Sequence, residues 1–385
     1  MSRGSIQRRG KQSWRIRFED GFDEAGRRKR RTFTFKGKRQ DAQRELTRLL
    51  SAADAGTLPE PSKATIVEHL RAWLDGTHGL APKTAERYRE LAELQIIPHL
   101  GNKVMQRLRP HEVKKWHDTL LKAGAKSGRP LSARTVGHAH RVLHRALEMA
   151  VETETLARNV ASVISPPKVE DGEVEILDAD QITTVIDRLA GHRLYEIVVV
   201  DLATGMRRGE LLALRLSDID LDDATVRIER SLEETKNGLR FKEPKTKQSK
   251  RTISLPPNAI AVLREHRRML LETRMALGLG KPDADSLLFA ELDGLPTAPN
   301  RLTRRWQDAC VSLDLPRVSF HALRHTHASA LIAAGLDVVM ISRRLGHKNP
   351  TVTLNVYGHL FKRDDKAAAG AIEAAMRTRG KPGTS

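Results

Sequence analysis

Two proline-containing segments divide this chain and constrain its fold more than any other feature. Residues 57–63 (TLPEPSK) and 165–175 (SPPKVEDGEVE) each hold two prolines among polar residues, a composition typical of linkers between domains. The chain has 385 residues, more than the ~100–200 of a typical domain. The sequence therefore predicts a multidomain protein with units at residues 1–57, 65–163 and 176–385.

The first unit is predicted to be a small α+β module. The stretches SWRIRFED and RRTFTFKG alternate apolar with basic or hydroxyl side chains, as strands with one buried face do. The segment GFDEAGRRKR between them is predicted to be a hairpin loop. A helix is expected from Asp41 to about Ala53, because leucines recur on one face and Gly56 follows as a stop signal.

The other two units differ in their periodicity. Between Thr65 and Val163, four segments with helical spacing are separated by proline or glycine, which predicts an all-α bundle. From Ile176 onward, helices are expected near residues 178–190 and 193–216, a strand-rich interval at 224–256, and helices from there to the C-terminus. The third unit is thus predicted to be mixed and mainly α, with a small antiparallel sheet.

The charge of the chain indicates a polyanionic partner. Lysine and arginine total 67 against 48 aspartate and glutamate, a formal net charge of +19. Residues 1–50 alone hold 16 basic and 6 acidic residues. Nucleic acid is the first candidate for the partner, and the first unit is its expected electrostatic anchor.

Composition also argues against several classes of protein. The single cysteine, Cys310, permits neither an internal disulfide nor a cysteine-based zinc site, which suits a reducing compartment. We find neither GxGxxG nor a P-loop, so nucleotide-dependent chemistry has no visible basis. Without a signal peptide or an apolar run near the ~20 residues of a membrane span, a soluble, cytoplasmic protein is expected.

One segment near the carboxyl end concentrates residues that could do chemistry. SFHALRHTHASALIAAG (319–335) places His321, Arg324 and His325 on one helix face, because they are three and four positions apart. A zinc site of the HExxH type would need a glutamate where Ala322 stands, which argues against a metallohydrolase. Taken by itself, the segment could also be a solvated or core-packed helix face.

Three further segments also carry residues that could do chemistry. TGMRRGELL places Arg207 after a glycine turn and before an apolar run. LGHKN ends a short helix at Gly346 and presents His347, and LNVYGHL carries Tyr357 near the end of the next helix. Any one segment would be a weak signal, but four in this order make a specific pattern.

The chain resembles the tyrosine recombinases, the family of phage integrases, over essentially its whole length. Four segments match the motifs of that family in order and spacing: TGMRRGELL, HALRHTHAS, LGHKN and LNVYGHL. The resemblance implies a set of residues that act on a DNA phosphate: Arg207, His321, Arg324, His347 and the nucleophile Tyr357. It also implies a lysine on a β-hairpin, for which Lys245 fits best, with Lys247 and Lys250 as alternatives.

The same resemblance implies partners and an assembly. Residues 1–57 would be an arm-type DNA-binding module, and residues 65–163 a core-binding domain that closes round the duplex. The expected partners are double-stranded DNA attachment sites, bound by a homotetramer, with a directionality factor and a DNA-bending host protein as further candidates. The chain would work at the nucleoid of a bacterial cell or phage-infected host, and would need neither metal nor cofactor.

The chemistry explains why these residue types occur together. Attack of the Tyr357 oxygen on a phosphodiester gains negative charge in the transition state, which fixed guanidinium groups stabilise selectively. Lys245 could protonate the departing 5′-oxygen, and His321 could help to remove the tyrosine proton. His347 would hydrogen-bond a phosphate oxygen.

Neighbouring residues are given lesser roles. We expect Glu210 to orient Arg207, Arg208 to be a solvated neighbour, His325 to be a buried polar contact behind the site, and His327 to be a packing residue. The segment DDKAAAGAIEAAMRT (364–378) is expected to form a helix that docks on a neighbouring protomer.

The leading hypothesis is a recombinase that integrates or excises a mobile element through a 3′-phosphotyrosyl intermediate. One alternative keeps the chemistry but resolves chromosome or plasmid dimers; the basic first unit argues against it. A second, from another class, is a catalytically inactive DNA-binding regulator, which retention of all five residues argues against.

Overall fold

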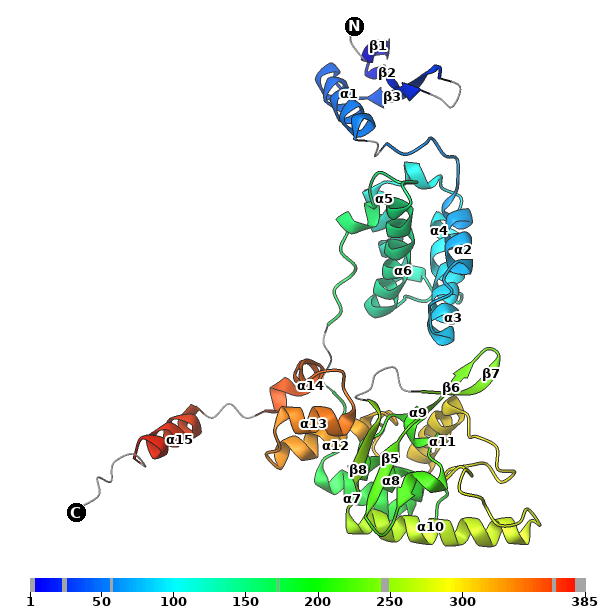
Figure 1. Cartoon of the computed structure of the whole chain (residues 1–385), viewed down its shortest axis with the longest axis vertical. Helices are drawn as coiled ribbons and strands as arrows, with labels where there is room; N and C mark the ends of the chain where they lie inside the picture. The colour runs from blue at the N-terminus through cyan, green and yellow to red at the C-terminus, as the bar shows by residue number, and fades with distance from the viewer. Residues whose placement is uncertain are drawn as a thin grey trace. The chain divides into compact units, whose positions relative to one another are not determined.

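The computed structural model describes residues 4–22, 26–55, 58–170, 172, 174–243, 249–361 and 365–377. The chain forms two compact units, Met1–Asp171 and Gly172–Ser385. Figure 1 shows that each unit is rich in helices and carries small antiparallel sheets. The predicted fold class is confirmed. Among the described residues, no helix combines the length and apolarity that a membrane span requires.

The amino-terminal part is a three-stranded antiparallel sheet with one helix. Strands β1 (Gly4–Gly10), β2 (Ser13–Phe22) and β3 (Arg28–Lys36) lie in that order, and α1 (Arg39–Asp54) follows. Ile16 and Phe18 are buried with α1 residues such as Leu46 and Leu49. Because side chains alternate along a strand, the opposite face is polar. Two cross-strand rows form on it: Ser5, Arg17 and Thr32, and Gln7, Arg15 and Thr34.

A helical bundle completes the first unit. Its elements are α2 (Ile66–Asp75), α3 (Pro82–Leu91), a π-helical turn (Ala92–Ile96), α4 (Ile97–Leu100), α5 (Pro110–Ala123) and α6 (Ala133–Glu152). A capping box starts α2, in which Thr65 and Glu68 each bond the other's backbone N–H. The apolar faces meet in one core that includes Leu70, Trp116 and Leu143. The predicted all-α region is confirmed.

Two histidines are buried inside this bundle. His117 of α5 and His140 of α6 are 3% and 4% exposed, and His117 Nε2 lies 3.1 Å from His140 Nδ1. Burial lowers the pKa of His117, and burial together with the neighbouring His117 and His144 lowers the pKa of His140 to about 4. Both rings are therefore neutral at pH 7.

These pKa values predict that the bundle loses stability in mild acid. Between pH 6.5 and 4 the unfolded histidines bind protons that the folded ones do not, so the free energy of unfolding falls as the pH falls through this window. Each unit of difference between the folded and unfolded pKa contributes about 1.4 kcal/mol. Urea unfolding at pH 7 and pH 5 should show the loss, and His140→Gln should reduce it. His99→Gln, at an exposed position, should keep the wild-type pH dependence; a His140→Gln dependence equal to wild type would contradict the assignment.

A glycine interrupts the second helical segment of the second unit. We expected one helix near 193–216, but this is wrong: α8 (Tyr195–Thr204) ends at Gly205, and the short α9 (Arg208–Leu211) starts after it. Gly205 has a φ of +62°, the left-handed conformation that ends helices. The helix expected at 178–190 is confirmed as α7 (Ala179–Leu189).

Two small sheets and six helices follow in the described ranges. Strands β4 (Ile219–Asp220), β5 (Thr225–Ile228) and β8 (Arg251–Ser254) form one sheet, and β6 (Ser231–Thr235) and β7 (Gly238–Lys242) form a hairpin. The helices are α10 (Pro257–Ala276), α11 (Pro299–Ser312), α12 (Ala322–Ala333), α13 (Val338–Leu345), α14 (Pro350–Tyr357) and α15 (Asp365–Arg377).

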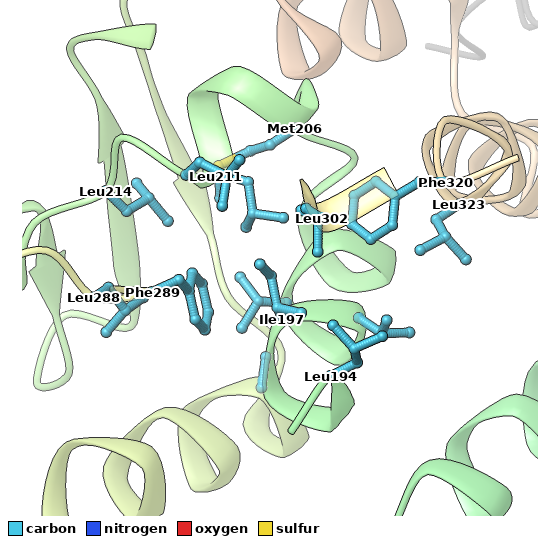
Figure 2. Close-up of a cluster of buried hydrophobic side chains, with 14 of the residues drawn as sticks. Leu194, Ile197, Met206, Leu211, Leu214, Leu288, Phe289, Leu302, Phe320 and Leu323 are labelled. Carbon is cyan, nitrogen blue, oxygen red and sulfur yellow. The ribbon is translucent and has the colours of Figure 1, made fainter. Parts of the chain in front are cut away.

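A single apolar core holds the start of α12 beside the segment around α8 and α9. Figure 2 shows Leu194, Ile197, Met206 and Leu211 lying near Phe320 and Leu323. The indole of Trp306 donates a hydrogen bond to the Val318 carbonyl, at 2.8 Å, just ahead of Phe320. The core thus fixes the two segments that carry Arg207 and Arg324.

Candidate active site

Two helices of the second unit end in glycines that no other residue could replace without strain. Gly205 ends α8 and Gly346 ends α13, with φ of +62° and +67°. A Cβ atom would lie 2.5 Å from His327 Cδ2 at Gly205, and 2.5 Å from Arg251 Nη1 at Gly346. Conformation and space both require glycine. The two helix ends therefore present carbonyl groups, which carry partial negative charge, to nearby arginines.

Arg324 joins these two helix ends. Its side chain is buried; Nη1 donates to the Gly205 carbonyl at 2.6 Å, and Nη2 donates to the Leu345 carbonyl at 2.8 Å. Burial and the positive charge of Arg207 lower the pKa of Arg324 to about 10. The guanidinium therefore stays charged at pH 7.

Arg207 is held beside it. Nη2 of Arg207 donates to the Gly346 carbonyl at 2.9 Å, so the adjacent residues Leu345 and Gly346 each hold one of the two arginines. Nη1 of Arg207 donates to Glu210 at 2.7 Å. The expectation that Glu210 orients Arg207 is confirmed. Arg208, expected to be solvated, is instead half-buried and bonds Thr303, because α11 packs beside it.

Arg251 is a third arginine of this network, and the sequence motifs did not indicate it. It opens β8, is 7% exposed at its side chain, and donates from Nη2 to Glu210 at 2.9 Å and from Nε to the Arg344 carbonyl at 2.7 Å. Burial acts to raise the pKa of Glu210, but the charges and hydrogen bonds of Arg251 and Arg207 lower it overall. In the sequence, Arg251 stands at the start of the strand-like stretch RTISL, which is the one local sign of a special role. Several other basic residues directly precede it, so nothing distinguishes it from them.

We predict that Glu210→Gln destabilises the second unit. The change leaves Arg251 buried with its counter-charge removed, and breaking a buried ion pair in this way costs about 3–5 kcal/mol. Urea unfolding of the full chain should show the loss. Glu265→Gln, which breaks the exposed pair between Glu265 and Arg268, is the matched control and should change stability little. Equal effects of the two variants would mean that Glu210 holds no arginine in place.

Tyr357 and the histidines belong to the segment that contains α12, α13 and α14, which lie together in Figure 1. His321 immediately precedes α12, His325 lies in its first turn, His347 lies between α13 and α14, and Tyr357 ends α14. The Tyr357 side chain is 1% exposed, and its hydroxyl lies 2.6 Å from His325 Nδ1. The His325 and His321 rings are in edge-to-face contact, with centroids 4.7 Å apart. His325, expected behind the site, is therefore in it. The spacing of the motif could not distinguish the two histidines, because they are four positions apart at the start of α12 and point to the same side.

The surroundings of these groups favour their neutral forms. Burial raises the pKa of Tyr357 to about 12, against the charge of Arg324. Loss of hydration and the charges of His325, Arg324 and Arg207 lower the pKa of His321 to about 4. Burial and the charges of Arg324 and Arg207 likewise lower the pKa of His347 to about 4. Its Nδ1 lies 2.8 Å from Thr353 Oγ1 of α14, which orients the ring.

The remaining predicted residues differ in their placement. Lys245 and Lys247 fall in 244–248, outside the described residues. Lys250 is exposed and lies 3.3 Å from Glu243. His327 is buried, with Nδ1 2.8 Å from the Leu202 carbonyl and Nε2 accepting from Arg344, as expected of a packing residue. Within the described ranges, no group of three or more His, Cys, Asp or Glu side chains is placed to hold a metal ion.

Two family models match the chain. Residues 175–364 match the phage integrase family, and residues 65–121 match the phage integrase N-terminal SAM-like domain. The site residues described above lie in the first of these ranges.

Relatives match over most of their length and most of this chain. A protein named tyrosine recombinase XerC-like, from Caldanaerobacter subterraneus subsp. tengcongensis, is 26% identical over 94% of this chain and 96% of its own. The integrase of Mycobacterium phage L5 is 29% identical over 82% of this chain and 81% of its own.

Solved structures share the fold. The Tn1549 transposon integrase, solved with transposon right end DNA, is 20% identical and gives a TM-score of 0.68 over 80% of this chain and 99% of its own. A lambda integrase tetramer bound to a Holliday junction is 16% identical and gives a TM-score of 0.58 over 93% of this chain and 96% of its own. Motifs, family models, relatives and fold agree: this chain belongs to the phage integrase family and is a tyrosine-type site-specific recombinase.

Proposed function

We propose that this recombinase cuts and rejoins double-stranded DNA through a 3′-phosphotyrosyl intermediate on Tyr357, and so integrates or excises a mobile element. One observation carries the proposal. The adjacent carbonyls of Leu345 and Gly346 hold Arg324 and Arg207 side by side, and the helix that follows ends at Tyr357. Two fixed positive charges beside a tyrosine suit an attack on a phosphodiester.

The proposed step follows from these charges. The Tyr357 oxygen bonds the phosphorus while the bond to the 5′-oxygen breaks, and the extra negative charge of the transition state falls on the non-bridging oxygens. Arg324 and Arg207 donate to those oxygens, and His347, oriented by Thr353, donates to a third position on the same phosphate. The phosphotyrosyl bond keeps the energy of the broken one, so a 5′-hydroxyl can later rejoin the strand.

We propose Lys245 as the acid that protonates the departing 5′-oxygen. Its position in the sequence supports this role, because it lies between β7 and the strand β8 that Arg251 opens. Of the two alternatives, Lys250 is exposed, and its Nζ forms an ion pair with Glu243 at 3.3 Å.

We propose that the first unit binds DNA. The polar face of its sheet carries Arg15 and Arg17 between Ser, Gln and Thr side chains, donors suited to phosphates and base edges, and we propose it as the arm-binding surface. Residues 65–163 are the proposed core-binding domain. A tetramer on DNA is the proposed assembly, supported by the lambda integrase tetramer.

The test is a covalent adduct with DNA. The full chain is incubated in EDTA with a nicked duplex that carries the DNA flanking its own gene, and the product is digested and sequenced by mass spectrometry. We expect a peptide containing Tyr357 joined to a 3′-phosphate. Binding to the same duplex with no adduct would favour the inactive regulator instead. Recombination of two identical sites, but not of two different attachment sites, would favour dimer resolution.

A further inference from the structure

The environment of the Tyr357 hydroxyl differs from what the motifs imply. The motifs assign proton removal to His321, yet the hydrogen bond recorded for this hydroxyl is to His325 Nδ1, at 2.6 Å. The two rings meet edge to face, with centroids 5.6 Å apart. A general base must lie about 2.6–3.2 Å from the atom whose proton it takes, and His325 fulfils this condition.

The direction of this hydrogen bond follows from the two groups. Tyr357 keeps its proton at pH 7, and within the described residues the structure records no second partner for its buried hydroxyl. The hydroxyl therefore donates, and Nδ1 of His325 accepts. Burial and the charge of Arg324 lower the pKa of His325, so the ring is neutral and its Nδ1 lone pair is free to accept.

We infer that His325 is the catalytic base of this recombinase, the group that takes the proton of Tyr357 as its oxygen attacks the phosphate. The inference rests on the proposed function. The oxygen–phosphorus bond forms, the bond to the 5′-oxygen breaks, the phenol proton passes to His325 Nδ1, and the general acid protonates the 5′-oxygen. On rejoining, the 5′-hydroxyl attacks and returns its proton to the general acid, now a base, while the bond to the tyrosine oxygen breaks and His325 returns its proton to that oxygen.

A base is needed because the phenol is a poor nucleophile while it keeps its proton. Burial raises its pKa to about 12, so few molecules are ionised at pH 7. The positive ring formed on His325 lies near the carboxylate of Glu175, whose charge favours it. Glu175 is itself held by the backbone N–H of Ser319, at 3.1 Å. Among the described residues, the hydrogen bond recorded for this hydroxyl is with His325 and not with His321, so His321 is left to contact the DNA.

The experiment compares single-turnover cleavage of the nicked duplex by the full chain and its variants. His325→Ala is expected to slow adduct formation by about 10²–10⁴-fold at pH 7, with DNA binding retained and the melting temperature lower by only a few degrees, as loss of one buried hydrogen bond implies. Fluorinated tyrosine at position 357, which has a more acidic phenol, is expected to restore the rate of His325→Ala by about tenfold or more and to change the wild type less. His359→Ala, an exposed histidine two residues after Tyr357, is the control and should cleave at the wild-type rate.

Each other outcome overturns the inference. An unchanged or faster rate in His325→Ala would mean that the bond only holds the hydroxyl while DNA is absent. A slow variant that the fluorinated phenol fails to rescue would give His325 a structural role. If the wild type forms the adduct, these failures concern His325 alone; if it forms none, the proposed function falls and the inference with it.

Discussion

Replacing Tyr357 with phenylalanine is expected to reduce the covalent protein–DNA adduct below detection while leaving DNA affinity unchanged. The change removes only the oxygen that attacks. The ring keeps its place among Ala328, Ile332 and Ile341, so the fold is retained. Losing the hydrogen bond to His325 should cost about 1 kcal/mol, which is too little to unfold the unit.

The control for this prediction is another tyrosine of the same unit. Tyr195→Phe removes the hydroxyl at the start of α8 and should form the adduct as the wild type does. Adduct yield on a denaturing gel and DNA affinity by a shift assay measure the two effects separately. An adduct that persists in Tyr357→Phe would assign the nucleophile to another residue.

Replacing Arg324 with lysine should have the second largest effect, a fall of about 10²–10³-fold in the rate of cleavage. Lysine keeps the charge but loses the planar fork, and an ammonium cannot bond the Gly205 and Leu345 carbonyls and still present two parallel donors to a phosphate. Stability should fall as well, by about 1–3 kcal/mol for each carbonyl left without a donor.

Arg305→Lys is the matched control for the loss of a planar fork. Arg305 of α11 donates from both Nη atoms to Glu291, at 3.0 and 2.8 Å, away from the carbonyls that hold Arg324. It should lose stability but cleave at nearly the wild-type rate. Equal rates in the two variants would remove Arg324 from the proposed phosphate contacts.

Part of the fold and the site could be predicted because the signals are local. The alternation of β2 and β3 and the helical spacing of the bundle led to the observed elements. The left-handed glycine that ends α13 lay in the LGHKN motif. The helix expected over 193–216 failed for a related reason. Its apolar residues run across Gly205, so periodicity extended the helix through a glycine turn that the TGMRRGELL motif had indicated.

The sequence by itself determined the family and indicated most of the residues that lie at the candidate site, because caps, turns and motif spacing depend on near neighbours. It predicted three units, whereas the structure packs residues 1–171 into one compact unit. Only the tertiary structure decided which groups touch. Arg324 bonds a carbonyl 119 positions away, Arg251 bonds a glutamate 41 positions away, and Tyr357 meets a histidine 32 positions away. His321 and His325 are equivalent in helical periodicity, and the packing of α14 on α12 selects between them. Such a choice depends on how separate elements pack, which the local pattern of one helix does not contain.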